Sequence, residues 1–478
     1  MTAPDRELPL RTQIPAITRR AFLQRIAAAS AATLAGCAPS GRNLPETAFA
    51  FGPTSAEVTS RSALVWFRTS GHSRVKAEYG TDPGFGKTSV TRAVEAGPAT
   101  DYTVVIELTG LLPNRQYFYR GVALAPDSAS SPARGPTGRF RTASETAKEF
   151  TCTWSADMEA GHQPFTLFDR IVEKDPHFFL HLGDTIYADR PRERAVSTLA
   201  GFRSKHRENR ADPHLQRLLA SMPVYAIWDD HEVQNDFDRT HPLIPLGRQA
   251  FREYWPIRSP SSDATLLYRH FSWGSGADFF ILDCRQYRRP KFEIVGPTKT
   301  MLGKTQKEWF QESIRASKAP FKFVISSIPF LGSWGLDKWS GYTAEREELI
   351  RFFHSERISG VIILSADLHA AADFIGPNGL RQFIAGPIAA WPHCLRHSQL
   401  RPHRATGLQF YLCGPFTYGL VTVRPETNPP EAEVQILDSA NAVRHQARVH
   451  ATSAASRIAP SGRHPQSTGH EGLVAPTT

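Results

Sequence analysis

The chain has 478 residues, more than one average domain, so we expect two or three folding units. Hydrophobic residues make up 41% of it and charged residues 21%, ordinary values for a globular protein with a buried core. The formal net charge is +10, but lysines and arginines form no run with interleaved aromatic residues, which argues against a nucleic-acid partner. A modest positive charge suits an anionic substrate or an anionic cell envelope, and it serves solubility equally well.

Residues 1–37 have the pattern of an export signal. Arg19 and Arg20 form a twin-arginine motif, and a short alanine-rich stretch follows at 26–35. That stretch is too short and too weakly apolar to span a membrane as a stable helix. We therefore expect export through the twin-arginine translocation machinery, which carries folded proteins and so suits a protein that acquires metal in the cytoplasm.

The end of this segment predicts its processing. The sequence Leu-Ala-Gly-Cys at 34–37 resembles a bacterial lipoprotein processing site, so Cys37 is expected to carry a lipid anchor. The alternative is ordinary signal cleavage near Ala38. Either outcome places the protein in the periplasm or at the cell surface, and the small, polar residues 38–47 are expected to form a tether.

The next segment, 48–143, predicts a small all-β sandwich. Apolar strands at 62–68 and 102–108 are separated by Gly, Pro and Asp turns at sandwich-like spacing. The stretch 111–119 resembles the corner-tyrosine segment of a fibronectin type III domain. No catalytic residues are apparent, so packing, spacing or shielding of the following domain is the expected role, with a boundary at 142–148.

From 149 to 440 the pattern changes to strands alternating with helices. Apolar residues at helical spacing predict a helix at 164–174. Thr305 with Glu308 predicts a capping box at the start of another helix. Thr343 precedes a third, whose acids lie at its N-terminal end.

The C-terminal part is expected to add closing strands at 421–449. A disordered tail rich in Ser, Pro, Gly and His is expected at 450–478. The histidines after residue 440 are assigned to solvated tail. Cys152, Cys284, Cys394 and Cys413 show no zinc spacing and allow two disulfides.

Acids or histidines follow four apolar strands of the second domain. Ligand sites in open α/β sheets form outside the carboxyl ends of strands, so these side chains are expected to converge. The strands lie at 150–154, 178–182, 224–228 and 361–364; the residues that follow them are Asp157, then Asp184 and Tyr187, then Asp229, Asp230, His231 and Glu232, then Asp367 and His369.

Converging carboxylates repel one another unless cations neutralise them. Oxygen ligands with some imidazole suit hard or borderline metals, and two such ions can bind a phosphoryl oxygen and lower the pKa of a bound water. Asp184 follows a glycine in a tight turn and is the natural bridging ligand. Tyr187 can reach the same ion, and a phenolate ligand favours Fe(III).

Three motifs together resemble the alkaline phosphatase D (PhoD-like) family of metallophosphatases. They are Gly183-Asp184-x-x-Tyr187, Asp229-Asp230-His231-Glu232 and Asp367-x-His369. The first is also similar to the purple acid phosphatases, which likewise carry an N-terminal fibronectin-like domain. The resemblance covers roughly 48–440 and includes the twin-arginine signal.

This resemblance implies an α/β fold, with a metallophosphoesterase-like β-sandwich core flanked by helices behind the fibronectin III-like sandwich. It also implies a binuclear centre, Fe(III) with Ca²⁺ or another divalent ion, that hydrolyses phosphomonoesters or phosphodiesters by attack of metal-bound hydroxide. Carried over motif by motif, the expected metal ligands are Asp157, Asp184 as the bridge, Tyr187 and His369 on the first ion, and Asp230 and Asp367 on the second.

The expected catalytic residues include Asp230 and His231. His231 would contact the phosphate or protonate the leaving oxygen. Arg285 and Arg288 match a family stretch with paired arginines that could clamp phosphate, and surface ion pairs are the alternative for both. Asp229 is expected to support the site rather than bind metal, because adjacent strand residues point to opposite faces.

The chain departs from the family pattern at the first strand. PhoD-like proteins usually have Ser-Cys-Gln there, with the cysteine on iron, whereas this chain has Ser155-Ala156-Asp157, so Asp157 is the expected substitute ligand. The wider superfamily places a histidine where Glu159 stands, and whether Glu159 binds metal is open. Cys152 lies inside the strand and is expected in the core.

A further departure concerns a histidine. The histidine expected after the strand at 321–327 is missing, with Ser326 and Ser327 nearby. Four other histidines are expected not to bind metal: His162, His177, His181 and His206.

Two rival functions follow from the same residues. One is a surface lipoprotein with a degenerate metal site, whose sandwich recognises an envelope polymer. The other is a metal-dependent hydrolase of a different ester class, such as phospholipids or cyclic nucleotides.

Overall fold

The computed structural model describes residues 48–124, 131–258 and 263–451, which belong to one compact unit. The predicted signal, lipid-attachment site and tether before residue 48, and the tail from 452 onward, lie outside the described residues. Within the described ranges, no helix has both the length and the apolar character that crossing a bilayer requires.

The first strands form the predicted small sandwich. One sheet has the order β1-β2-β6, and the other has β4-β3-β7-β8 with β5 beside β3. Tyr117 confirms the corner-tyrosine expectation, since its hydroxyl accepts a hydrogen bond from the Leu112 N–H at 2.9 Å. The strands are β1 (Phe49–Ala56), β2 (Ser62–Thr69), β3 (Ser73–Gly80), β4 (Ser89–Val90), β5 (Val94–Ala96), β6 (Thr103–Thr109), β7 (Gln116–Leu124) and β8 (Ala133–Arg141).

Buried polar contacts join this sandwich to the rest of the unit. The Trp66 indole N–H donates to the Glu253 carbonyl at 2.7 Å. The buried Arg210 guanidinium lies between the Trp66 and Trp255 rings, at 4.5 and 4.3 Å from their centroids, and donates to Thr54. Such desolvated cation–π contacts are each worth up to about 2 kcal/mol, so the sandwich packs firmly here, in agreement with the packing role expected of it.

Two larger sheets form the core of the segment that follows the small sandwich. The six-stranded sheet has the order β11-β10-β9-β19-β20-β21, and the seven-stranded sheet has β12-β13-β14-β15-β17-β16-β18. The first runs through β9 (Phe150–Ser155), β10 (Phe178–His181), β11 (Val224–Ala226), β19 (Thr417–Arg424), β20 (Glu431–Asp438) and β21 (Val443–His450). The second runs through β12 (Arg269–Trp273), β13 (Ala277–Ile281), β14 (Phe321–Ile325), β15 (Val361–Ser365), β16 (Ala371–Ile375), β17 (Arg381–Ile384) and β18 (Leu408–Leu412).

Side-chain alternation along these strands builds the layers. In the seven-stranded sheet, Phe279 and Phe323 belong to the core that it shares with the six-stranded sheet. Their neighbours Phe280 and Val324 belong to a second core with Phe310 of α6 and Leu349 of α7. The predicted sandwich flanked by helices is therefore confirmed.

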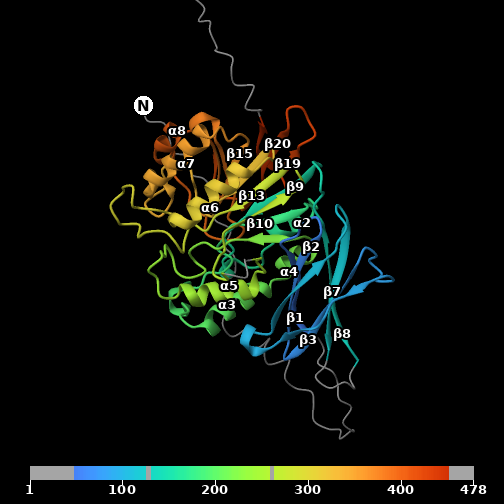
Figure 1. Ribbon diagram of the computed structural model, residues 1–478. Coiled ribbons are helices and arrows are strands. Elements are labelled where there is room, and N and C mark those ends of the chain that lie inside the picture. Colours follow the sequence, from blue (N-terminus) through green and yellow to red (C-terminus); the bar gives the residue numbers. More distant parts are fainter. Residues whose placement is uncertain (1–47, 125–130, 259–262, 452–478) are drawn as a thin grey trace, which may run out of the picture. The chain divides into compact units, whose positions relative to one another are not determined.

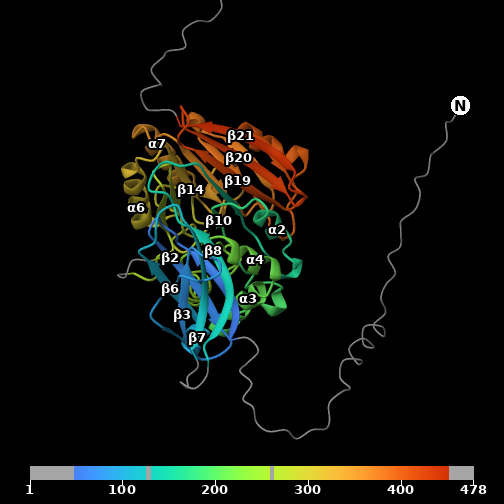
Figure 2. The same cartoon turned by 90° about the vertical axis from the view of Figure 1, so that its right-hand side faces the viewer.

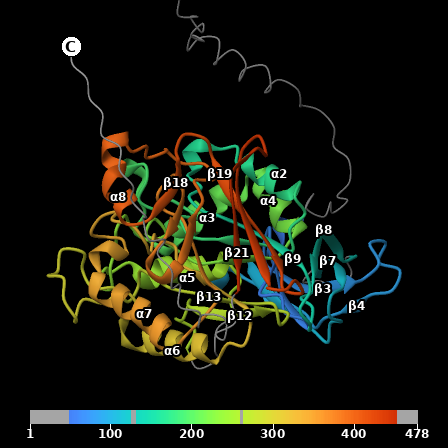
Figure 3. The same cartoon turned by 90° about the horizontal axis from the view of Figure 1, so that it is seen from above.

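Helices cover both outer faces (Figures 1 and 3), with α6 and α7 on the side of the seven-stranded sheet and α2 and α4 on the opposite side. Figure 2 shows β19, β20 and β21 side by side at the end of the six-stranded sheet. The helices are α2 (Leu167–Val172), α3 (Leu199–Arg210), α4 (Pro213–Ser221), α5 (Ile244–Tyr254), α6 (Gly303–Ala316), α7 (Thr343–Ser355) and α8 (Arg401–Ala405).

The capping box predicted for Thr305 and Glu308 is wrong. α6 begins at Gly303, so Thr305 lies inside its first turn. The free N–H groups before and at this start have other acceptors: the Thr300 hydroxyl accepts from Gly303 at 2.8 Å, and the Glu345 carboxylate accepts from the two residues between them. α7 begins at Thr343 as predicted.

The closing strands predicted at 421–449 are present as β19, β20 and β21, so strands continue past residue 440. β21 pairs antiparallel with β20 and ends at His450. His445 is therefore not a tail residue: its ring stacks on Phe410 and its Nε2 lies 2.8 Å from the buried Asp373 carboxylate.

Of the four candidate cysteines, Cys394 and Cys413 form a disulfide, whereas Cys152 and Cys284 are free and buried.

Candidate metal centre

The carboxyl ends of four strands carry the predicted site. β9, β10 and β11 run parallel as neighbours in one sheet, and β15 lies in the other. The loops after β9 and β10 are hydrogen-bonded: the Asp157 N–H donates to Gly183 O at 3.2 Å, and the Met158 N–H donates to Asp184 O at 3.0 Å. These bonds hold the two turns, and the acids on them, side by side.

The backbone of the site is strained. Asp157, Asp184, Asp367 and His369 adopt left-handed conformations, with φ between 51° and 65°. Each such residue costs on the order of 1 kcal/mol, and such strain clusters at functional sites. Gly183 has φ 111°, and a Cβ there would lie 2.5 Å from the Asp229 Cβ, so only glycine fits the turn that presents Asp184.

The predicted ligands converge in three overlapping clusters, within each of which the potential ligand atoms lie within 4.8 Å of one another. Asp184 belongs to two clusters and Asp230 to two, so these carboxylates link the groups. The clusters are Asp157 with Asp184 and His369, Asp184 with Asp230 and His231, and Asp229 with Asp230 and Asp367. Tyr187 completes the set, its hydroxyl 3.3 Å from His369 Nε2. That these residues bind metal stays a prediction.

The donor set fits cations. Asp157 Oδ2 and Asp230 Oδ1 are buried and have no hydrogen-bond partner among the described residues. Burial, together with neighbouring acids, raises the pKa of the Asp184 and Asp157 carboxyls. A cation would satisfy the free oxygens and favour the ionised acids, and carboxylate, phenol and imidazole donors suit iron and calcium-type ions.

His369 is arranged as a ligand. Its Nδ1 is bonded to the Trp391 carbonyl, which directs Nε2 toward Asp157, 3.8 Å away. Burial lowers the pKa of His369 to about 3, so the ring is neutral at physiological pH, the form that binds metals.

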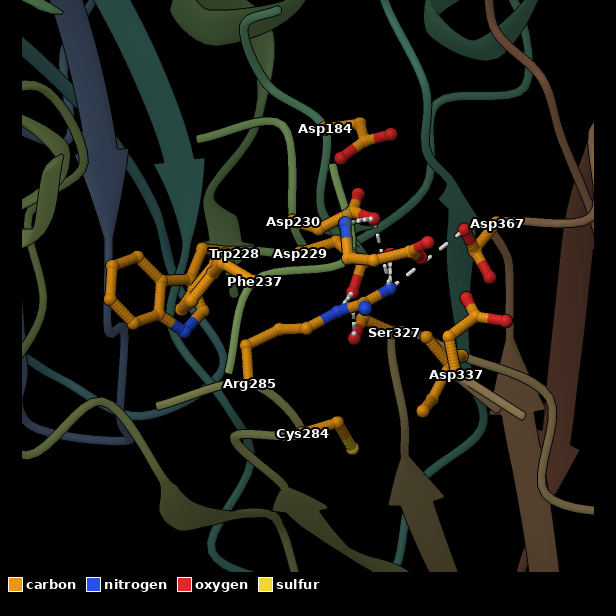
Figure 4. Close-up of polar contacts among 12 residues, drawn as sticks. Asp184, Trp228, Asp229, Asp230, Phe237, Cys284, Arg285, Ser327, Asp337 and Asp367 are labelled. Carbon is orange, nitrogen blue, oxygen red and sulfur yellow. Dashed lines mark hydrogen bonds and ion pairs between the residues drawn. The ribbon is translucent and has the colours of Figure 1, made fainter. Parts of the chain in front are cut away.

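Arg285 lies among the acids rather than at their edge. Its side chain is fully buried and forms a bidentate pair with Asp229, and its guanidinium also lies 3.6 Å from Asp230 and 3.9 Å from Asp367 (Figure 4). Burial alone would raise the pKa of Asp230, but Arg285 and His231 reverse this and lower it. Asp229 thus supports the site through Arg285, but the expectation that it faces away from Asp230 is wrong, because both follow the end of β11 and share one cluster with Asp367.

The predicted phosphate clamp needs correction. Arg288 is fully buried and donates to the Phe237 and Asp337 carbonyls, at 2.8 and 2.7 Å, so it braces two loops. Arg285 is committed to Asp229, and neither arginine lines the cavity over the site. Their acceptors lie about fifty residues away in sequence, and only the tertiary fold brings them near.

His231 is held by a partner that sequence analysis missed. Its Nδ1 lies 2.6 Å from the Asp189 carboxylate, and its ring stacks on Tyr187 at 4.2 Å between centroids. Although burial lowers the pKa of His231, Asp230 and Asp189 outweigh it and raise the pKa. Asp189 follows Tyr187 by two residues, so its place in the same turn was the available signal.

Glu232 belongs to the second motif, in which it was given no role. In the structure its buried carboxylate accepts several hydrogen bonds. One carboxylate oxygen accepts from the Thr185 N–H and hydroxyl, at 2.6 and 2.7 Å. The other accepts from the Asp184 and Asp229 N–H groups, at 3.2 and 2.8 Å. Four bonds to one carboxylate fix the loops after β10 and β11 relative to each other.

Lys338 is a second residue that sequence analysis missed. Its ammonium pairs with Asp367 and with Asp337, the latter at 2.6 Å, and its side chain is 11% exposed. It lies in the long loop between β14 and α7, and no local pattern marks it.

Three other residues, in or near β9 or in the region of the missing histidine, have structural contacts. Glu159 pairs with His162 at 3.4 Å and belongs to none of the clusters found in the described ranges. Ser327 donates to Asp229 at 2.8 Å in the region where the family histidine is missing. Cys152 is a core residue.

A cavity of about 240 Å³ opens over the centre. It is lined by Asp184, Asp230, His231, Asp367 and His369 from the predicted set, and by Arg190, Asn235, Asp236, Trp334, Lys338, Leu368, His393, Leu395 and Tyr411.

Comparison with known proteins agrees with this fold. The family model of the PhoD-like phosphatases matches residues 150–383, and that of the PhoD-like phosphatase N-terminal domain matches 36–144. The chain is 28% identical over 390 residues to alkaline phosphatase D of Bacillus subtilis (strain 168), covering 69% of this chain and 66% of that protein, just under two thirds of its length.

Two solved structures share the fold. A structure of PhoD aligns with a TM-score of 0.74 at 23% identity, over 86% of this chain and 94% of the other. The purple acid phosphatase PPD1 of yellow lupin (Lupinus luteus) aligns with a TM-score of 0.61 at 14% identity, over 83% and 74%. Both alignments support the same sandwich fold for this chain. The chain belongs to the PhoD-like phosphatase family, a family of enzymes.

Proposed function

We propose that this protein is an exported, metal-dependent phosphoesterase that hydrolyses phosphomonoesters, phosphodiesters or both at a binuclear centre. The observation that carries the proposal is the linkage of three ligand clusters through Asp184 and Asp230 beneath one cavity. Seven acids and histidines from four strand ends meet in these clusters, and mutual repulsion among the carboxylates disfavours such a gathering without cations.

The residues divide between two ions. Tyr187, His369 and Asp157 would hold Fe(III), because a phenolate favours a trivalent metal, and Asp230 with Asp367 would hold Ca²⁺ or another divalent ion. Asp184 would bridge them. Two bound cations neutralise charge on the phosphoryl group and acidify water.

The chain's own contribution to proton transfer centres on His231. The Asp189 carboxylate accepts a hydrogen bond from the Nδ1–H of His231, which leaves the Nε2–H available for donation. With its pKa raised, the imidazolium can donate that proton to the leaving oxygen as the ester bond breaks. Arg285 pairs with Asp229 and lowers the pKa of Asp230, and it does not line the substrate cavity.

Export rests on the sequence alone. The twin arginines Arg19 and Arg20 and the Leu-Ala-Gly-Cys at 34–37 support translocation of the folded protein and a lipid on Cys37. Mass spectrometry of the protein from its native envelope would identify the mature N-terminus and any attached acyl chains.

The test of the proposal is metal content with turnover. Purified full chain is loaded with iron and calcium, its ions are counted by elemental analysis, and hydrolysis of an aryl phosphate monoester and diester is followed. Asp184→Asn is expected to lose bound metal and at least about a hundredfold in rate, because the bridging charge is removed. Asp82→Asn, on an exposed sandwich turn, is the matched control and should change neither.

Full activity in Asp184→Asn would refute the assigned role. A wild-type chain that holds no metal and turns over no ester would favour the rival function of an envelope-binding lipoprotein. Profiling with phospholipids and cyclic nucleotides separates the remaining ester classes.

A further inference from the structure

Arg190 has a fixed backbone beside the metal centre. Its N–H donates to Tyr187 O at 3.3 Å, and its carbonyl accepts from the Lys205 ammonium. The residue before it, Asp189, is bound to His231 and to the Asn235 N–H. The main chain that carries Arg190 is therefore held from several sides, at the rim of the cavity.

The side chain of Arg190 is uncommitted. In the part of the chain that the structure describes, its guanidinium has no hydrogen bond or ion pair, and its contact is with the Tyr187 ring, 5.6 Å from the centroid. The other cationic side chain that lines the cavity, Lys338, is paired with Asp367 and Asp337. The main chain of Arg190 is held in place, and its guanidinium has no anionic partner among the described residues. This side chain is therefore available to bind an anion in the cavity.

The neighbours of Arg190 point to the same role. His231 and His393 line the same cavity as Arg190, whose positive charge no anionic side chain of the described residues pairs with. An anion held between Arg190 and the metals would neutralise that charge.

We infer that Arg190 binds the phosphoryl oxygens that the metals leave free, and that it favours phosphomonoesters over phosphodiesters. This inference rests on the proposed function and assigns to Arg190 the clamp that Arg285 and Arg288 cannot provide. A monoester dianion has three terminal oxygens that share two charges, so oxygens remain for the planar fork of the guanidinium beside those on the metals, whereas a diester has two terminal oxygens that share one charge.

Binding of product-like anions tests the inference apart from turnover. Titration calorimetry on the metal-loaded full chain uses inorganic phosphate as the dianion and dimethyl phosphate as the monoanion. Arg190→Met keeps an apolar stem over Tyr187 and is expected to weaken phosphate binding at least about tenfold and dimethyl phosphate binding about threefold or less. Arg194→Met is the matched control: it lies nearby but is 65% exposed and pairs with Glu208, so it should bind as wild type does.

Elemental analysis of each variant accompanies the titration. Should Arg190→Met lose metal, Arg190→Lys replaces it as the test variant, since it keeps the charge but not the fork, and an intermediate loss is expected. Phosphate affinity within twofold of wild type in the metal-loaded variant overturns the inference, and equal losses for both anions overturn the monoester preference. A loaded wild type that neither binds phosphate nor turns over any ester refutes the proposed function instead.

Discussion

Glu232→Gln is the sharpest perturbation of the site's scaffold. Each carboxylate oxygen of Glu232 accepts two hydrogen bonds, and the donors are the backbone of Asp184, Thr185 and Asp229 and the Thr185 hydroxyl. An amide has one carbonyl oxygen, so two of the donors would face an NH₂ group. Leaving two buried donors unsatisfied costs about 1–3 kcal/mol each, and we expect the free energy of unfolding to fall by about 4 kcal/mol.

The effect on metal should be separable from the effect on stability. Glu232 touches the backbone of Asp184 and Asp229 but lines no part of the cavity. Mutation of groups that orient ligands costs about 10–100-fold in metal affinity, and we expect a loss in that range. Burial raises the pKa of Glu232 to about 7, so unfolding in guanidinium chloride and metal binding are both measured at pH 8.5, where the carboxylate is ionised.

Glu345→Gln is the matched control. Glu345 is also buried and accepts from Thr300, Met301 and Leu302, but it orders the start of α6. We expect this variant to lose about 1–3 kcal/mol of stability, because only the Thr300 hydroxyl loses its acceptor, and to lose no metal affinity. A Glu232→Gln protein that unfolds within about 1 kcal/mol of wild type, or one that binds metal no worse than Glu345→Gln, would refute the reasoning.

Three further outcomes are expected. Burial lowers the pKa of His181 to about 3 from 6.5, so the unfolded chain binds the proton first: stability is full above pH 6.5 and falls as pH drops toward 3, by about 2 kcal/mol at pH 5, and His181→Leu should flatten the curve of unfolding free energy against pH by that amount. Replacing Cys394 and Cys413 by serine opens a loop with sequence separation 19 and should lower the unfolding free energy by about 3 kcal/mol, while unchanged melting would contradict this. Tyr187→Phe should abolish the visible charge-transfer absorption of the iron-loaded protein, and a spectrum identical to wild type would remove the phenolate from the ligand set.

Strand-end acids were predictable because their position follows from local sequence. Asp157, Asp184, Asp230 and Asp367 each follow an apolar strand, and parallel strands bring their carboxyl ends together. Asp157, Asp184 and Asp367 adopt left-handed conformations, which short polar residues tolerate, and the Gly183 that precedes Asp184 is a further local signal.

Residues whose roles depend on distant partners were not predictable. Arg285 finds Asp229 at 56 positions' separation, and Lys338 reaches Asp367 from a loop without periodicity. The same limit explains the error at Thr305, because the acceptors that begin α6 are Thr300 and the remote Glu345. His445 was assigned to the tail although it lies within the predicted closing strands, and its contacts with Phe410 and Asp373 follow only from the fold.

Arg285 places one positive charge among the acids, and this charge remains when a chelator removes the metal ions. Arg285 and Lys338 together offset the repulsion among Asp229, Asp230 and Asp367. The metal-free site is therefore expected to keep its geometry. Ions can then be exchanged in the folded protein, and which cations the centre carries becomes a property of its surroundings as much as of its polypeptide.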